Sequence, residues 1–460
     1  MMINMTECIL MKNNEINIKV EKIIFGGEGL GYFDDKVVFV PESVPGDELK
    51  VNIISSKKNY SRGIITEIIK SSKNRVIPKC HYFNECGACD FMMMNYNTQL
   101  AYKKEMVKEV VGSLASIFDY ELYDTIASEN IYHYRNKVIQ AIGKENSKII
   151  SGFYKKRTHD IVDNDNCIIQ PVIFNKIIKK IKENAYENSI IIYDEKSRKG
   201  SLRNVMLRIN KIGEIMLVIV TNEKKYKKIQ QLAMEICNSF KEIKSCYISI
   251  NLTGSNVVLG KENIHIYGEK NIYENINGMT FLISPLSFFQ VNTHQAEKMY
   301  NIAYSYINDL ENKIVVDAYA GTGTIGAIFA RKSKYVYSIE LVKDACNDAN
   351  RNIKINKLSN MKVINGSVDD KLIELLNNKN KVDVIIFDPP RKGLEIEIID
   401  KISNLKIPEL VYISCNPSSF ARDAKLLCEK GYKLMKIQPI DMFPNTNHIE
   451  IISKFEFIYN

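Results

Sequence analysis

The sequence predicts an α/β protein in which a doubly wound, mainly parallel sheet follows a small N-terminal β-barrel and a central α+β domain. Three observations support this fold class. The chain has 460 residues, more than one hydrophobic core usually holds. Short runs that alternate apolar and polar residues occupy positions 16–69, and from position 314 strand-like runs alternate with helical stretches. We therefore expect domains at residues 1–75, 76–283 and 284–460.

The N-terminal domain is expected to be a barrel because its alternating runs are short and separated by turn signals. Gly26-Gly-Glu-Gly and Pro45-Gly-Asp are the clearest of these turns. The last part of the domain is rich in basic residues around Tyr60, a mixture that suits phosphate contacts and base stacking. These residues are Lys50, Lys57, Lys58, Arg62, Lys70, Lys73 and Arg75. A solvated barrel edge would have the same composition, so both interpretations stay open.

The net charge of +9 favours an anionic partner, since basic groups gain free energy when they release the counterions of a polyphosphate. The first 20 residues lack the apolar segment of a signal peptide, and no uncharged apolar run is long enough to span a bilayer. We therefore expect a cytoplasmic monomer without a membrane partner. In that reducing compartment, clustered cysteines are expected to be metal ligands or catalysts.

A cofactor site is predicted where the first strands of the C-terminal domain end. The strand at 314–317 leads into Ala318-Tyr-Ala-Gly-Thr-Gly323, whose glycines let the backbone approach a ligand closely. The next strand ends at Glu340, where a carboxylate can accept hydrogen bonds from ribose hydroxyls. Sites for NAD and for S-adenosylmethionine share both features, so these residues alone leave the two cofactors open.

Two further strand ends carry reactive side chains. One predicted strand ends in Asp388-Pro-Pro-Arg and the next in Ser414-Cys415-Asn-Pro. A free cysteine is usually a small buried hydrophobe. Cys415, however, is expected at the ligand-binding edge of an open α/β sheet, which favours a catalytic thiol. Closer to the C-terminal end, His448 and Glu450 offer an imidazole and a carboxylate that can pair with this thiol as a base.

Four cysteines are predicted to bind a metal. Five residues separate Cys80 from Cys86, two separate Cys86 from Cys89, and Cys167 is the candidate for a fourth ligand. Zinc and an iron-sulfur cluster both accept four thiolates, and the spacing does not distinguish them.

In their order along the chain, these motifs resemble the RNA (uracil-5-)-methyltransferase family over essentially the whole length. The matching segments are Ser284-Pro-Leu-Ser-Phe-Phe-Gln290-Val-Asn, Asp317-Ala-Tyr-Ala-Gly-Thr-Gly-Thr, Asp388-Pro-Pro-Arg, Ser414-Cys-Asn-Pro and His448-Ile-Glu450. The resemblance implies a Rossmann-like domain that binds S-adenosyl-L-methionine through Gln290, Tyr319, Glu340 and Asp388. It also implies that Cys415 is the nucleophile and Glu450 the base in the methylation of C5 of a uridine in RNA.

The resemblance extends to the other parts of the chain. The barrel looks like the RNA-binding TRAM domain, and the helix that begins near residue 95 is expected to pack on the catalytic domain. Relatives with this cysteine arrangement carry a [4Fe-4S] cluster and modify ribosomal RNA. This favours 23S rRNA as the substrate, with transfer RNA as the alternative. Ser367 stands where many relatives have an acidic residue, so we leave it out of the cofactor site.

Two other functions are compatible with parts of the sequence. An amino methyltransferase that acts on adenine or glutamine has a similar Asp-Pro-Pro loop, but it needs an aromatic residue where this chain has Arg391. A noncatalytic RNA-binding protein with a vestigial methyltransferase fold is not expected to keep both Cys415 and Glu450. Residues 134–137 and 203–208 are candidate RNA contacts or ordinary polar surface.

Overall fold

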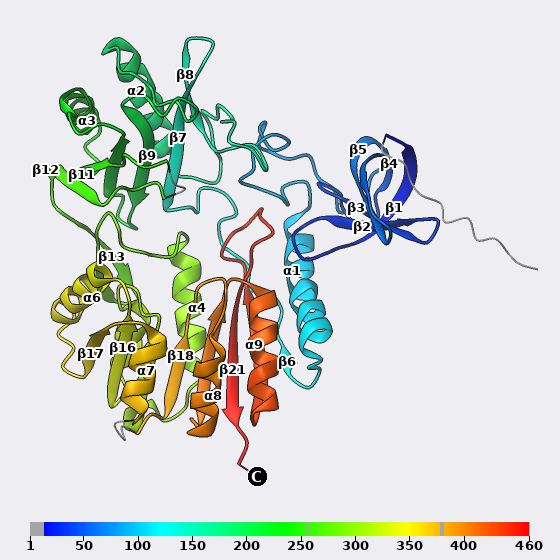
Figure 1. Ribbon diagram of the computed structural model, residues 1–460, viewed down its shortest axis with the longest axis vertical. Helices are drawn as coiled ribbons and strands as arrows, with labels where there is room; N and C mark the ends of the chain where they lie inside the picture. Colours follow the sequence, from blue (N-terminus) through cyan, green and yellow to red (C-terminus); the bar gives the residue numbers. More distant parts are fainter. Residues whose placement is uncertain (1–12, 255–256, 378–380, 460) are drawn as a thin grey trace, which may run out of the picture.

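The computed structural model describes residues 13–254, 257–377 and 381–459. Its N-terminal part is a closed barrel, blue in Figure 1, with the strand order β1-β2-β3-β5-β4. The strands are β1 (Glu15–Ile23), β2 (Gly29–Phe33), β3 (Lys36–Val40), β4 (Glu48–Ser56) and β5 (Tyr60–Lys70). In β1 the side chains of Ile16, Ile18 and Val20 are buried and those between them are exposed, because successive residues of a strand face opposite sides. The predicted barrel is confirmed.

The central part is built on a six-stranded sheet with the order β12-β11-β10-β9-β7-β8. Its strands are β7 (Lys137–Glu145), β8 (Lys148–Gly152), β9 (Leu202–Ile209), β10 (Ile215–Thr221), β11 (Ile243–Ile250) and β12 (Glu262–Gly268). Parallel neighbours need a crossover, and α3 (Lys227–Ser239) provides it between the parallel strands β10 and β11. The other pairs are antiparallel, and α2 (Val172–Glu187) packs beside α3 in one core with the sheet.

The C-terminal part contains an eight-stranded sheet with the order β17-β16-β15-β18-β19-β21-β20-β6. The strands from β17 to β19 are parallel, and β21 inserts antiparallel between β19 and β20. Their bounds are β6 (Glu121–Leu122), β15 (Ile314–Ala318), β16 (Tyr335–Glu340), β17 (Met361–Asn365), β18 (Val384–Phe387), β19 (Glu409–Ser414), β20 (Tyr432–Ile440) and β21 (Glu450–Phe457).

Helices separate the strands of this sheet, as the alternating pattern after residue 314 predicts. They are α5 (Thr324–Ala330), α6 (Lys343–Ile355), α7 (Val368–Asn377), α8 (Ile396–Asn404) and α9 (Pro417–Glu429). Before β15 come α4 (Thr293–Ser305) and a short 3-10 turn at Leu310–Asn312. A hairpin of β13 (Ile272–Ile276) and β14 (Met279–Ile283) connects the central part to α4 and packs on α6.

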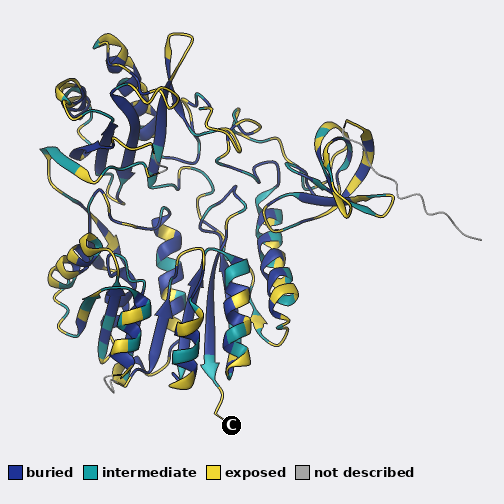
Figure 2. Cartoon of the chain, in the orientation of Figure 1, coloured by how far each residue is buried: buried dark blue, intermediate teal, exposed yellow. Residues whose placement is uncertain are grey.

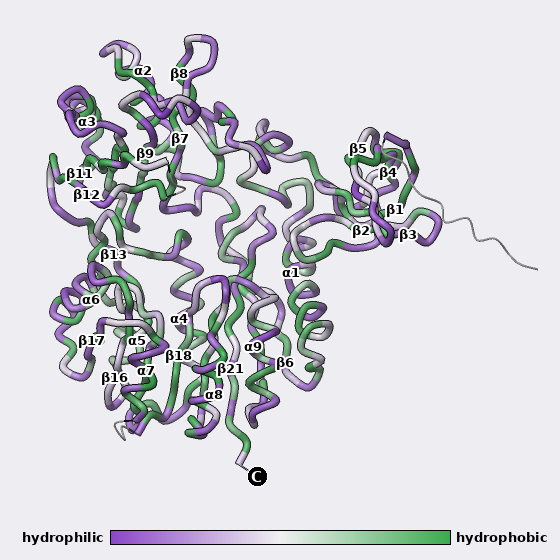
Figure 3. The backbone as a smooth tube through the Cα atoms, viewed as in Figure 1, coloured by the Kyte–Doolittle hydropathy of each residue, from purple (hydrophilic) through white to green (hydrophobic). Residues whose placement is uncertain are grey.

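Both faces of the C-terminal sheet are covered, and successive residues of a strand enter different cores. Val315 packs with α4 and α5, whereas Val316 packs with α7, α8 and α9. Ile386 and Ile385 of the neighbouring strand divide in the same way. This explains why these strands are continuous apolar runs in the sequence. Figure 2 shows the strands buried, and Figure 3 shows hydrophilic residues on outlying helices such as α3 and α6.

The helix α1 (Tyr96–Val110) precedes the central sheet in sequence but lies against the C-terminal sheet. It contacts α9 and β20, and β6 adds to the free edge of β20. A π-helical turn at Val111–Ala115 continues α1 and packs on α9. This is the packing expected of the helix near residue 95, and it means that residues 76–283 contribute to two sheets. None of the helices in the described ranges has the length and apolar character of a membrane span.

A fully buried ion pair joins α1 to the loop at 441–449. Lys103 Nζ lies 2.6 Å from Asp441 Oδ1 and 3.2 Å from the Phe443 carbonyl oxygen, and both charged side chains are 0% exposed. The Tyr96 hydroxyl donates to the other Asp441 oxygen at 2.8 Å. Burial lowers the pKa of Lys103, and the Asp441 carboxylate opposes that shift. The attraction between the two charges offsets the free-energy cost of removing them from water. Loss of one partner leaves the other charge buried and unpaired, which destabilises the fold.

Lys103→Met should lower the free energy of unfolding by about 3–5 kcal/mol, because it leaves the Asp441 carboxylate buried without its counter-charge. Denaturant unfolding followed by circular dichroism measures the loss. Lys104→Met is the matched control, since Lys104 pairs with the 94% exposed Asp124 and exposed pairs contribute at most about 1 kcal/mol. Equal losses in the two variants would contradict the role assigned to the buried pair.

Candidate active site

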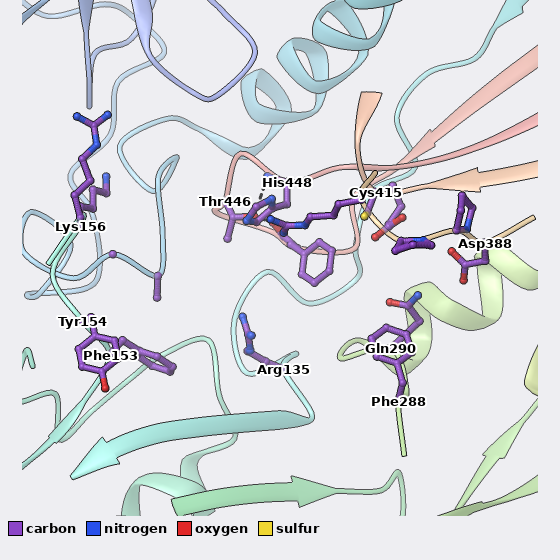
Figure 4. Close-up of a pocket in the computed structure, with 18 of the residues that line it drawn as sticks. Arg135, Phe153, Tyr154, Lys156, Phe288, Gln290, Asp388, Cys415, Thr446 and His448 are labelled. Atoms are coloured by element: carbon purple, nitrogen blue, oxygen red, sulfur yellow. Dashed lines mark hydrogen bonds between the residues drawn. The ribbon is translucent and has the colours of Figure 1, made fainter. Parts of the chain in front are cut away.

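Three of the predicted site residues meet because they follow adjacent parallel strands. Tyr319, Asp388 and Cys415 come directly after β15, β18 and β19. The register of β15 and β18 pairs Ala318 with Phe387, and β19 continues the same parallel ladder, so the three strand ends lie at one edge of the sheet. All three residues line a cavity of about 880 Å³, which Figure 4 shows in part.

Glu450 reaches the same edge from the opposite direction. It is the first residue of β21, which runs antiparallel to β19 and pairs Ile451 with Ser414. Cys415 and Glu450 are the next residues of these paired strands, and both line the cavity. Glu450 is buried and Cys415 is half-buried. The fold therefore places a thiol and a carboxyl group at one wall, the pair expected of a nucleophile and a base.

Burial and the cation of Arg391 have opposite effects on the pKa values of the acidic groups in the site. Burial raises the pKa of Asp388 to about 7. Burial, and then the neighbouring Asp388, raise the pKa of Glu450 well above its usual value, while Arg391 lowers it. Burial and Glu450 raise the pKa of the Cys415 thiol to about 11, and Arg391 again acts in the opposite direction. Arg391 is therefore the cation that favours the ionised form of both reacting groups.

The turn after β15 forms a backbone cradle beside these groups. Tyr319, Gly321 and Gly323 have φ angles of 66°, 55° and 76°, a left-handed path that only glycine adopts without strain. A Cβ added at Gly321 would meet nothing within 4 Å, so open space lies over the turn. Glu340 ends β16, and its Oε2 accepts a hydrogen bond from the Gly321 N–H at 2.8 Å. Glu340 thus lies under the cradle and does not line the 880 Å³ cavity.

Asp317 is a buried acidic residue in β15, close to the glycine turn. It is fully buried, and its Oδ2 accepts hydrogen bonds from the Gly326 N–H and the Ser338 hydroxyl. Its Oδ1 is buried and has no hydrogen-bond partner among the described residues. Burial raises the pKa of this carboxyl group to about 7. An unpaired acceptor and free space above a glycine turn fit a nucleoside cofactor bound at this edge.

Gln290 connects the cofactor edge with the central domain. It lines the cavity from the segment between β14 and α4 (Figure 4). The Asn136 side chain donates to the Gln290 carbonyl oxygen at 3.0 Å, and the Asn136 N–H donates to Val291 at 2.7 Å. The structure therefore brings the following predicted site residues to one cavity: Gln290, Tyr319, Asp388, Cys415 and Glu450.

Comparison with known proteins agrees with this arrangement. Residues 95–453 match the tRNA (Uracil-5-)-methyltransferase family, and residues 10–66 match the TRAM domain. The chain belongs to the tRNA (uracil-5-)-methyltransferase family. The enzyme is S-adenosylmethionine-dependent and acts on C5 of uracil in RNA. An amino methyltransferase and a noncatalytic RNA-binding protein are therefore not supported.

Similar proteins cover nearly the whole methyltransferase chain. An RNA methyltransferase of Fusobacterium nucleatum, described as uncharacterized, is 50% identical over 449 residues, which is 97% of each chain. Another from Clostridium tetani is 40% identical over 442 residues, 96% of each chain. The crystal structure of Pyrococcus abyssi tRNA (uracil-54, C5)-methyltransferase in complex with S-adenosyl-L-homocysteine is 27% identical, with a TM-score of 0.78 over 96% of this chain and 100% of that one.

Part of the cavity wall in this methyltransferase comes from segments that the motifs do not mark. Residues 153–157, which follow β8, line the cavity, and so do Gly87 and Ala88 of the cysteine segment. The Gly87 N–H donates to the Tyr154 carbonyl oxygen at 3.0 Å, which joins the two segments. Figure 4 places this wall across the cavity from Cys415. The basic run at 155–157 is a signal in the sequence, but nothing local to it indicates that it lines the same cavity as the thiol.

The four predicted metal ligands of the methyltransferase surround one small cavity. Cys80, Cys86, Cys89 and Cys167 all line it. Burial, and then the other three thiols, raise the pKa of Cys89. Burial raises the pKa of Cys167 to about 11. Within the described ranges, however, no group of three or more His, Cys, Asp or Glu side chains is placed so that it could hold a metal ion. The cysteines converge as expected, and the metal site stays a prediction.

The candidate RNA contacts of the central domain have different surroundings. Arg135 lines the main cavity, and its Nε donates to the Lys137 carbonyl oxygen at 3.2 Å. Arg208 is 1% exposed and donates to the Ser287 carbonyl oxygen at 2.9 Å. Arg203 is 6% exposed and donates to the Thr253 carbonyl oxygen at 2.7 Å. Both arginines are buried and bonded within the protein, so they fit neither an RNA contact nor an ordinary polar surface.

The Cys415 thiol should react with iodoacetamide at a rate that rises about tenfold per pH unit from pH 7 to 10, because only the thiolate reacts and the pKa is raised to about 11. Arg391→Gln should slow this reaction at any fixed pH, since loss of the cation raises that pKa further. Peptide mass spectrometry follows both rates, with the half-buried Cys428 as internal control. A rate independent of pH, or equal slowing at both cysteines, would show that Arg391 does not favour the thiolate.

Proposed function

We propose that this enzyme methylates a uridine of 23S rRNA through a covalent bond between Cys415 and C6 of the base, on a Rossmann-like catalytic domain. The observation that carries the proposal is the position of Cys415 beside Glu450 at the wall of the cavity that Gln290, Tyr319 and Asp388 also line. Transfer RNA is the alternative substrate, because the related Pyrococcus abyssi enzyme is a tRNA methyltransferase.

Cys415 starts the proposed reaction. C5 of uracil is a poor nucleophile, and addition of the Cys415 thiolate to C6 shifts electron density onto C5 and O4. S-adenosylmethionine, when bound, supplies the methyl group that C5 takes. Gln290, Tyr319 and Asp388 would hold this cofactor in the cavity, and Glu340, at the end of β16, is proposed as a further cofactor-binding residue. Arg391 contributes by favouring the thiolate over the thiol.

Glu450 completes the reaction. Its carboxylate removes the proton from the methylated C5, the electrons of that C–H bond form the C5–C6 double bond, and the C6–S bond breaks to release the Cys415 thiolate. A buried carboxylate whose pKa is raised is a stronger base than an exposed glutamate, which suits the removal of a proton from carbon. The same burial favours the protonated acid, and Arg391 counteracts this by favouring the anion.

The uridine has to leave its base stack before it reaches Cys415. This costs roughly a few kcal/mol and costs least where the RNA is single-stranded. The wall opposite Cys415 carries Lys155, Lys156 and Arg157 beside the aromatic Phe153, a mixture that suits an extended RNA strand. The three cations pair with Glu85, Glu42 and Glu28, so RNA phosphates would have to displace these carboxylates. The exposed ring of Phe288 lines the cavity as well. We therefore propose a loop or an unfolded segment of RNA as the substrate.

Cys415→Ala should abolish methyl transfer while RNA binding persists, because only the nucleophile is removed. Glu450→Gln should accumulate a protein-RNA adduct, because the C5 proton stays in place and Cys415 cannot leave. Transfer of labelled methyl groups to RNA and denaturing gels of the protein-RNA mixture measure the two outcomes. Normal methylation by the Cys415→Ala variant would rule out the covalent mechanism.

The RNA used in this assay is taken from cells that lack the gene, divided into ribosomal and transfer RNA. We expect label in 23S rRNA, and mapping of 5-methyluridine then identifies the position. Label confined to transfer RNA would replace the proposed substrate and leave the mechanism intact.

We also propose that Cys80, Cys86, Cys89 and Cys167 hold a [4Fe-4S] cluster, with zinc as the alternative. Their convergence on one cavity supports the proposal, because four thiolates are a donor set that both metals accept. When bound, the metal would connect the segment at 80–89 to Cys167. It would thereby fix Gly87 and Ala88, which line the catalytic cavity.

Protein purified without oxygen should be brown, absorb near 400 nm and contain roughly four iron atoms per chain. Cys86→Ser should lose most of this iron, since one of the four thiolates is gone. Cys428→Ser is the control, because Cys428 lies on α9 and does not line the cysteine cavity. One zinc per chain without iron would show that the alternative metal is bound. Protein that contains neither iron nor zinc would contradict the proposal.

A further inference from the structure

Cys415 also borders a second cavity, on the side of the molecule where the barrel lies. This cavity has a volume of about 190 Å³. Arg391, Cys415 and His448 line both cavities, so the two spaces meet at the reactive thiol. Phe25 and Gly26 of the barrel line only the second one. Nothing in the proposed reaction uses this space.

The turn of the barrel that borders this cavity is fixed in place. The Asn447 side chain donates to the Gly26 carbonyl oxygen at 2.8 Å. Gly27 has a φ angle of 86°, and a Cβ there would lie 3.0 Å from Asn447 and 3.2 Å from Phe91, so the backbone packs closely on the loop at 441–449. Glu28 pairs with Arg62 at 2.6 Å within the barrel. Hydrogen bonding and close packing therefore hold the barrel turn in place as one wall of the cavity.

The side chains around this cavity suit a nucleobase. Phe25 is 45% exposed, so part of its side chain is accessible to a base that stacks on it. Arg391 carries a cation and His448 an imidazole at the same cavity, and such groups hydrogen-bond to the edges of splayed bases. The amide of Asn416 is already used, because it donates to the Arg391 carbonyl oxygen and accepts from the Ser418 N–H. A lipid or an apolar peptide would offer no hydrogen-bond partner to Arg391 or His448.

We infer that the cavity between Phe25 and Cys415 binds the base of a nucleotide next to the target uridine, stacked on the ring of Phe25. This inference rests on the proposed function and adds a specificity site to it. The target uridine occupies the main cavity, and its neighbour along the strand turns toward the barrel. The barrel then takes part in choosing the sequence around the uridine, beyond holding RNA through its phosphates.

The test uses synthetic RNA centred on the uridine identified by mapping, in three forms: intact, without the base that precedes the uridine, and without the base that follows it. For the unaltered enzyme, kcat/KM should fall roughly tenfold for one of the two abasic RNAs, the loss of one base-aromatic stack. Phe25→Ala should cause a similar fall with intact RNA. It should cause no further fall with that abasic RNA, because the same contact is already missing. Phe25→Trp should restore most of the activity.

Tyr32→Ala is the matched control, because Tyr32 lies on β2 of the same barrel, is 46% exposed and lines neither cavity. It should leave kcat/KM unchanged for all three RNAs. Additive losses from Phe25→Ala and the missing base, or equal effects of Phe25→Ala and Tyr32→Ala, would overturn the inference. Absence of methyl transfer by the unaltered enzyme would be a different result, since it would end the proposed function itself.

Discussion

The buried contact between Lys103 and Asp441 holds the base of the loop at 441–449, and the parts of the active site are assembled on this loop. The Asn445 carbonyl oxygen accepts the backbone N–H groups of Asp90 and Phe91, which directly follow Cys89. The Tyr134 hydroxyl of the central domain donates to the loop at 3.1 Å, and Asn447 binds the barrel turn. The loop then leads directly into β21. One buried ion pair thus holds the loop at 441–449, which contacts the barrel, the central domain and the segment that follows Cys89.

Burial of the active-site groups opposes the ionisation that the proposed reaction needs. Glu450 and Cys415 work in the proposed reaction as anions, yet burial raises the pKa of each and so favours its protonated form. Arg391 acts against burial at both reacting groups. Substrate and cofactor enter a site in which proton affinity is already high, which makes Glu450 a strong base once it is ionised.

The sequence predicts the cofactor edge well because parallel strands all end at one side of a sheet. Tyr319, Asp388 and Cys415 each follow an apolar run, and this local pattern is enough to bring them together. Glu450 is different, since it begins a strand, and only the antiparallel insertion of β21 turns it toward the thiol. The order of the central strands was not predictable, because it depends on which runs pair across long connections. Phe25 and residues 153–157 reach the site through such distant contacts.

An RNA-binding module that is joined to a catalytic domain only by a linker can be exchanged for another without loss of chemistry. The close approach of Gly27 to Asn447 and Phe91 makes this barrel a different kind of part. A substitute barrel would have to reproduce a turn without a side chain at that point, and the loop opposite it would have to fit the new surface. A change in the barrel turn or in the loop at 441–449 would therefore require a compensating change in the other, because the two form one interface.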